Sequence, residues 1–224
     1  MELFISLNFV ANCLFIAGSA WTEYKKSGTV HGIPMPVGIK DGQKLEKPIF
    51  TPSTKAEQGA HDENISPEQG TSIFLPSYPF FFPKPFSAAK IIGQDLYDKI
   101  SSAALKLYEE AANYAQTRGV ILADTKFEFG LVVVNGSEKE LILIDELLTP
   151  DSSRYWPLEE YVPGEAQPSF DKQYVRDWLV KAGFRKGLES GPVGKEGQGW
   201  FIDEEVVKGT QERYAEAVNL LTRE

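Results

Sequence analysis

The sequence predicts an α+β fold in which an antiparallel sheet is flanked by helices. Apolar residues recur with a helical period from residue 95 to 118, and Gly119 follows as a stop signal. Residues 120–134 then alternate like a strand, and the turn Asn135-Gly136-Ser137-Glu138 leads into an apolar run at 141–145. A strand, a short turn and a returning strand are typical of a β-hairpin. We therefore expect a hairpin beside a long helix.

Two more helices are predicted in the last third of the chain. One begins at the candidate cap Ser169 and ends before Gly183, and the other runs from Asp203 to about Leu221. An apolar stripe on the second helix comprises Val207, Thr210, Tyr214, Val218 and Leu221. By contrast, residues 21–69 are rich in turn signals, which favour short strands and ordered loops over helices.

Composition excludes several classes of protein. The 224 residues are 42% hydrophobic, as in ordinary globular domains, and 23 basic against 32 acidic residues give a net charge of −9. This charge argues against nucleic acid or an anionic membrane surface as a partner. The single cysteine, Cys13, excludes a disulfide framework and a cysteine-based zinc site.

Two segments stand apart from the rest. Residues 1–17 are almost entirely apolar and resemble the core of a secretory signal, but the first basic residue is Lys25, beyond the apolar run. A buried strand or a poorly placed terminal segment is the favoured interpretation, and secretion is the alternative. Residues 71–92 combine prolines and phenylalanines without helical or strand periodicity, so we expect an irregular insertion there.

The densest chemical signal is LADTKFEFG at residues 122–130. On a strand, alternation places Asp124, Lys126 and Glu128 on one face and apolar side chains on the other. Carboxylates with a lysine between them suit a magnesium-bound polyphosphate, because oxygen ligands and a cation are both supplied. The alternative is a solvated outer face of the sheet.

The hairpin register extends this row of charges. If four residues form the turn, Val134 faces Lys139 and Asp145 lies directly opposite Glu128. Two opposed carboxylates destabilise a sheet unless a cation lies between them. This register predicts a cation site between Glu128 and Asp145.

Two polar loops offer further candidates. The loop after the hairpin contains Asp151, Ser153 and Arg154, which suit the hydroxyls and phosphate of a sugar phosphate. Its alternative is an Asp-capped turn with a surface arginine. The loop at 51–66 holds Lys55, His61 and Asp62, which on pattern alone form a hydrogen-bonded loop.

Several strings together resemble the SAICAR synthetase (phosphoribosylaminoimidazole-succinocarboxamide synthase) family in its fungal form. They are LADTKFEFG, GSAWTEYKKSGTVHGIPMP, EKPIFTPSTKAEQGAHDENIS, IDELLTPDSSRYW and SFDKQYVRDWL. The resemblance covers about residues 18–69 and 93–224, so we divide the chain into an apolar segment at 1–17 and a family domain at 18–224.

The resemblance implies a cytoplasmic ligase of purine biosynthesis that uses ATP and Mg²⁺. Such a ligase joins carboxyaminoimidazole ribonucleotide and L-aspartate into SAICAR, with release of ADP and phosphate. A carboxylate reacts with an amine only after activation, and phosphoryl transfer from ATP provides that activation.

Carried over by position, the resemblance also implies roles for single residues. Lys126 and Asp124 are expected to be catalytic, and Lys126, Glu128 and Asp145 to bind the nucleotide. The expected metal ligands are Asp124, Glu128 and Asp145. The expected substrate-binding residues are Ser19, Lys55, His61, Asp62, Asp151, Ser153, Arg154 and Arg176.

The sequence also departs from the family pattern. Family members begin with a small nucleotide-binding lobe, and residues 1–16 do not resemble it. We therefore expect the chain as written not to turn over. Two alternatives to the ligase stay open: a catalytically silent ribonucleotide-binding fragment, or a secreted hydrolase that uses paired carboxylates.

Overall fold

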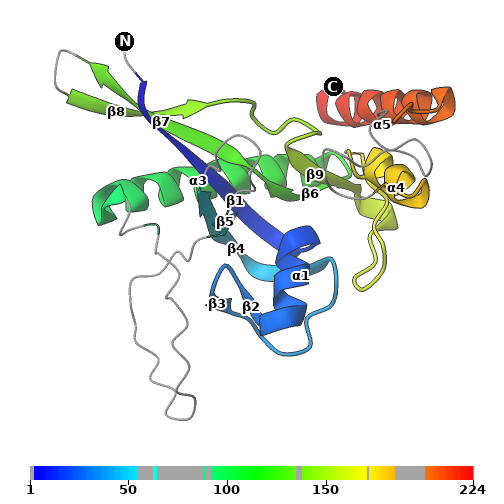
Figure 1. Ribbon diagram of the computed structural model, residues 1–224, viewed down its shortest axis with the longest axis horizontal. Coiled ribbons are helices and arrows are strands. Elements are labelled where there is room, and N and C mark those ends of the chain that lie inside the picture. The colour runs from blue at the N-terminus through cyan, green and yellow to red at the C-terminus, as the bar shows by residue number, and fades with distance from the viewer. Residues whose placement is uncertain are drawn as a thin grey trace.

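The computed structural model describes residues 3–54, 63–64, 88, 92–134, 138–170, 172–184 and 200–223. These residues form one seven-stranded antiparallel sheet, a separate two-stranded hairpin and flanking helices (Figure 1). The predicted α+β class is confirmed. Lys55, His61, Asp62 and most of the segment 71–92 lie outside the described residues.

The sheet is arranged around its first strand. The main path has the order β5 (Glu63–Asn64), β4 (Gln43–Thr54), β1 (Leu3–Ile16), β6 (Val120–Thr125) and β9 (Ser153–Pro157). Two further strands, β7 (Phe127–Val134) and β8 (Glu138–Ile144), form the predicted hairpin, and β7 also pairs with β1. The small sheet comprises β2 (Thr29–Val30) and β3 (Ile33–Pro34).

The apolar start of the chain is the central strand, as the buried-strand interpretation expected. β1 pairs with β4 along one edge and with β6 and β7 along the other. An apolar run suits a strand that has neighbours on both edges, and Cys13, Phe15 and Ile16 at its end are buried. The domain boundary at residue 17 stays a prediction.

The helices are α1 (Gly18–Ser27), α3 (Gln94–Thr117), α4 (Gln173–Lys181) and α5 (Glu204–Thr222), with a 3₁₀ turn at Leu158–Glu160. α3 crosses the sheet, whereas α4 and α5 lie together near β6 and β9 (Figure 1). Predicted helices 95–118 and 203–221 are thus confirmed. No described helix is long and apolar enough to cross a membrane.

Tyr108 ties α3 to the centre of the sheet. Its side chain is fully buried, and its hydroxyl accepts a hydrogen bond from the Leu14 amide at 3.2 Å. The same hydroxyl lies 2.7 Å from the carbonyl of Leu122 and 2.9 Å from that of Ala123, to which it donates. Desolvation by burial raises the pKa of Tyr108 well above its ordinary value, which keeps the donor proton in place.

The predicted hairpin register is wrong by one residue. Val134 pairs with Glu138, so three residues rather than four connect the strands, and Glu128 faces Ile144. Asp145 follows β8 at a φ of 65°, beyond the last strand pair. Because side chains alternate along a strand, the one-residue shift removes the expected opposition of Asp145 and Glu128.

Local helix signals were also misread at three places. Residues 21–27 belong to α1, although turn signals favoured loops there. The residue before α4 is Lys172 rather than Ser169, whose hydroxyl instead donates to the Tyr155 carbonyl at 3.4 Å. On α5 the buried residues are Val206 and Ala217, while Val207 and Val218 of the predicted stripe are exposed.

Candidate functional site

Strand pairing brings together two charged residues that are distant in sequence. β6 and β9 are antiparallel, and Asp124 is the pairing partner of Arg154. The Arg154 guanidinium donates to an Asp124 carboxylate oxygen in a salt bridge, and both side chains are half-buried. Because a carboxylate fixes the guanidinium plane, Arg154 presents its other N–H groups in a set direction.

The start of α1 lies directly against this arginine. Gly18, the first residue of α1, has a φ of 57°, and a Cβ atom there would lie 2.6 Å from an Arg154 guanidinium nitrogen. The positive φ favours glycine, and a Cβ atom there would displace the guanidinium end of Arg154. No side chain caps the helix start, so its backbone N–H groups and Arg154 together favour an anion.

A cavity of about 240 Å³ opens beside Arg154. We call it the Arg154 cavity. Its polar and charged lining residues are Asp41, Arg154, Glu165, Gln167, Ser169, Gln173 and Asp177, and Ala17, Gly18, Trp156 and Ala166 complete it. One cationic group among carboxylate, amide and hydroxyl groups suits a ligand that carries both an anionic group and hydrogen-bond donors.

Two titratable groups near Arg154 have raised pKa values. Burial, and then the charge of Asp124, raise the pKa of the Cys13 thiol, so this cysteine stays protonated. Burial also raises the pKa of Asp41, while the positive charges of Lys25 and Arg154 act in the opposite direction. Cys13 thus serves as a packing residue beneath the site, and Asp41 is a carboxyl of the cavity wall.

The remainder of the charged row continues along the sheet. Lys126 lies between β6 and β7, and its ammonium group is 3.1 Å from a carboxylate oxygen of Glu128. Glu128 is only 6% exposed. A buried carboxylate needs a partner, and the Lys126 ammonium compensates its charge. The Ser153 hydroxyl, also buried, lies 2.6 Å from that of Thr125.

The remaining predicted site residues occupy different environments. Ser19 is exposed in the first turn of α1, next to Gly18, and Arg176 is exposed on α4. Asp151 is exposed in the turn before β9, and a hydrogen bond from Thr149 lowers its pKa. Their roles in substrate binding stay predictions.

The three predicted metal ligands do not form one cluster. Within the described ranges, which include all three carboxylates, no group of three or more His, Cys, Asp or Glu side chains could hold a metal ion. Asp124 is paired with Arg154, Glu128 is paired with Lys126, and Asp145 lies beyond the end of β8. In this arrangement the three side chains do not fit a common magnesium site.

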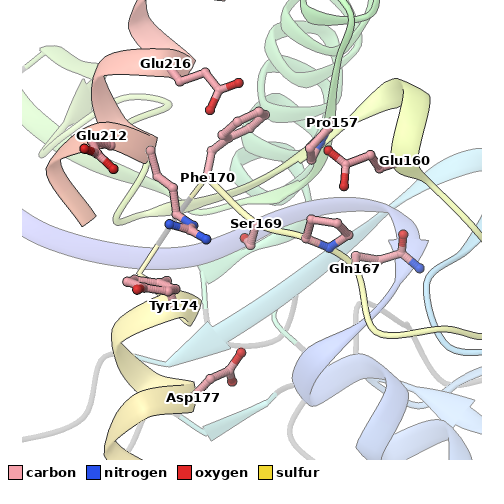
Figure 2. A pocket seen from close by; sticks show the side chains of 11 residues that line it. Pro157, Glu160, Gln167, Ser169, Phe170, Tyr174, Asp177, Glu212 and Glu216 are labelled. Carbon is pink, nitrogen blue, oxygen red and sulfur yellow. The ribbon is translucent and has the colours of Figure 1, made fainter. Parts of the chain in front are cut away.

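A second cavity of about 410 Å³ adjoins the first one and shares Gln167, Ser169 and Asp177 with it. Figure 2 shows Tyr174 and Asp177 on α4 facing it from one side, and Glu212 and Glu216 on α5 from another. The shared residues form the partition between the two cavities. The position of α4 therefore affects both.

Comparison with known proteins identifies the family to which this chain belongs. The family model described as SAICAR synthetase matches residues 5–190, and the chain belongs to this family. A phosphoribosylaminoimidazole-succinocarboxamide synthase from Pichia angusta is 48% identical over 208 residues. That match covers 93% of this chain and 58% of the relative. The enzyme of the same name from Saccharomyces cerevisiae is 45% identical over the same shares.

Solved structures agree with this assignment. The chain resembles the SAICAR synthase from Saccharomyces cerevisiae complexed with SAICAR, with a TM-score of 0.72 and 40% sequence identity. That match covers all of this chain and 62% of the other. The chain thus spans about three fifths of the length of the relatives it matches.

Several residues of the candidate site were not found from the sequence. Asp41, Gln173 and Asp177 line the Arg154 cavity, and Gly18 lies against the arginine, yet none of the four was singled out for binding. Gly18 carried no side-chain signal of a helix start, because no capping residue precedes it. The others are single polar residues that only tertiary packing brings to the cavity.

Proposed function

We propose that this chain carries the ribonucleotide-binding part of an ATP-dependent ligase. The reaction joins carboxyaminoimidazole ribonucleotide and L-aspartate into SAICAR, with release of ADP and phosphate. The observation that carries the proposal is the Arg154 guanidinium, which Asp124 holds against the start of α1 at the edge of a cavity. Family membership and the likeness to a SAICAR-bound structure support it.

The cavity chemistry suits this ligand. An anionic group of the ribonucleotide, carboxylate or phosphate, would lie between Arg154 and the uncapped helix start. The ribose hydroxyls and the imidazole amino group are donors, and Asp41, Asp177 and Ser169 offer acceptors. Ser19 and Asp151 are proposed to contact the same ligand. Ser19 directly follows Gly18, which lies against Arg154, and Asp151 lies in the turn just before β9, the strand that carries Arg154.

The nucleotide is proposed to bind beyond this cavity, along the row of charged residues Asp124, Lys126 and Glu128. ATP with its Mg²⁺ supplies, when bound, the phosphoryl group that activates the substrate carboxylate. Lys126 would hold a phosphate charge, and Glu128 fixes the direction of the Lys126 ammonium at 3.1 Å. Asp145, Lys55, His61, Asp62, Ser153 and Arg176 remain proposed contributors to nucleotide or substrate binding.

Two measurements test the proposal. Calorimetric titration with SAICAR should show saturable binding at one site. Incubation with ATP, aspartate and the carboxylated ribonucleotide, followed by mass analysis, should give SAICAR only if the chain is a complete ligase. Binding without product would support the silent ribonucleotide-binding alternative. Absence of both, in a protein shown to be folded by circular dichroism, would overturn the proposal.

A further inference from the structure

We propose that Tyr174 and Arg213 clamp α4 onto α5 and thereby position the α4 wall of the Arg154 cavity. The inference rests on the proposed function, because the ligand concerned is the one in that cavity. Tyr174 and Arg213 act as positioning residues, since neither lines the Arg154 cavity.

The α4 helix packs on the rest of the protein through half-buried residues only. None of its nine residues is buried. Nevertheless, Gln173 and Asp177 of this helix line the Arg154 cavity, and the Gln173 amide donates to the Asp177 carboxylate at 2.8 Å. Because no residue of this wall is fully buried, specific surface contacts have a large part in holding it in place.

The clamp supplies such a contact. The Arg213 guanidinium carbon lies 3.8 Å from the centre of the Tyr174 ring, which is a close cation–π contact. Arg213 also donates to the Gly209 carbonyl at 3.1 Å on its own helix. Because this bond anchors the guanidinium to α5, the stacked ring fixes α4 relative to α5.

Gly209 allows the two helices to approach. A Cβ atom at this position would lie 2.8 Å from the Tyr174 hydroxyl oxygen and 3.0 Å from a ring carbon. Glycine inside a helix lowers helix stability, and α5 nevertheless carries it at the point where Tyr174 packs. The ring thus lies on bare helix backbone between Gly209 and Arg213.

The clamp acts on the turn of α4 that faces the cavity. Tyr174 directly follows Gln173 and precedes Asp177 by three residues, so all three lie within about one helical turn. Figure 2 shows Tyr174 and Asp177 on this helix, with Glu212 on α5 across the second cavity from Tyr174. Loss of the clamp should let this turn shift and misplace both wall residues.

The test compares SAICAR affinity in matched α5 variants of the whole chain. Arg213→Met should weaken SAICAR binding by about three- to thirtyfold, the range that cation–π contacts span. Arg213→Lys keeps a cation and should lose less. Lys208→Met removes the same charge from an exposed site on the same helix, so its dissociation constant should equal that of the wild type.

Gly209→Ala gives a second signature that a purely structural role would not produce. Alanine has the higher helix propensity, but its Cβ would lie 2.8 Å from the Tyr174 hydroxyl oxygen, so the two effects oppose each other and the melting temperature should change little. Its Cβ should also push the Tyr174 ring away from Arg213 and weaken SAICAR binding. Hydrogen exchange of the peptide that covers α4 should accelerate in the ligand-free Arg213→Met protein.

The outcomes separate this inference from the proposed function. If the wild type binds SAICAR and both Arg213→Met and Gly209→Ala bind it equally well, the clamp is overturned and the proposed function stands. If the wild type does not bind SAICAR, the proposed function fails and this inference fails with it. Weakened binding in Lys208→Met to the same extent would also overturn the clamp, because any loss of charge would then suffice.

Discussion

Two of the walls of the Arg154 cavity, the sheet and α4, are built in different ways. One wall belongs to the sheet, where Arg154 is held by Asp124, and β6 and β9 are anchored by the fully buried Leu122 and by Tyr155. The other wall is α4, which buries none of its residues. The difference teaches that the Arg154 guanidinium is fixed by the sheet, whereas the opposite wall depends on contacts of half-buried residues.

The largest expected contrast is between the contributions of the sheet and of α4 to the free energy of unfolding. Phe127 on β7 is fully buried, and Phe127→Ala should lower the free energy of unfolding by about 3–5 kcal/mol. Val180 on α4 is 68% exposed, so Val180→Ala should change it by less than about 0.5 kcal/mol. Urea unfolding of both variants measures the contrast, and equal losses would show that α4 is as well anchored as the sheet.

Gly18 should connect stability to ligand binding. Alanine at a φ of 57° is strained, and Gly18→Ala should lower the free energy of unfolding by about 1–2 kcal/mol. Its Cβ should also displace the Arg154 guanidinium and weaken SAICAR binding. Gly28 at the other end of α1 has a φ of 71° with no atom near its Cβ position, so Gly28→Ala is the matched control. Equal SAICAR affinity in both variants would refute the contact.

Glu128 tests the corrected register. Since Glu128 is buried and paired with Lys126, Glu128→Gln should lower the free energy of unfolding by about 1 kcal/mol. Opposition to Asp145 would instead predict an unchanged or raised stability, because repulsion would be relieved. The exposed Glu140 on β8 serves as control through Glu140→Gln, which should have almost no effect.

The free energy of unfolding should fall at alkaline pH, because Tyr155 on β9 is buried in its protonated form. Burial raises the pKa of Tyr155 from 10.0 to about 12. The folded state therefore holds this proton more tightly than the unfolded state, so the contribution is complete below pH 10 and declines as the pH rises towards 12. By pH 10.5 the loss should reach about 1 kcal/mol. Tyr155→Phe should flatten this part of the stability profile, and an unaltered profile would assign the effect to other groups.

Most of the fold was predictable because its signals are local. The long helix α3 follows from a sustained apolar period and a glycine stop, and the β7–β8 hairpin from alternation around a turn. The register failed by one residue because the number of residues in the turn decided it, and the sequence did not specify that number. α1 was missed because it begins at an uncapped glycine, without the side-chain signal that marks most helix starts.

The candidate site was predictable only in part. Asp124 and Arg154 were both selected, but for different ligands, because their salt bridge depends on the pairing of β6 with β9 across 30 residues. The row of Asp124, Lys126 and Glu128 was expected to serve a magnesium-bound polyphosphate, yet each carboxylate is compensated by a basic side chain. Long-range pairing, rather than residue type, decided what each charge does.

The affinity of SAICAR for the Arg154→Ala protein tests the central claim most directly. Arg154 provides the fixed cation of the cavity, and removal of one such partner costs about 1.5–3 kcal/mol, or about tenfold or more in the dissociation constant. Arg118→Ala removes an arginine that stacks on Tyr114 at the end of α3 and should leave SAICAR binding unchanged. Calorimetry should therefore show a loss of at least about tenfold for Arg154→Ala alone. Wild-type affinity in a folded Arg154→Ala protein would contradict the account.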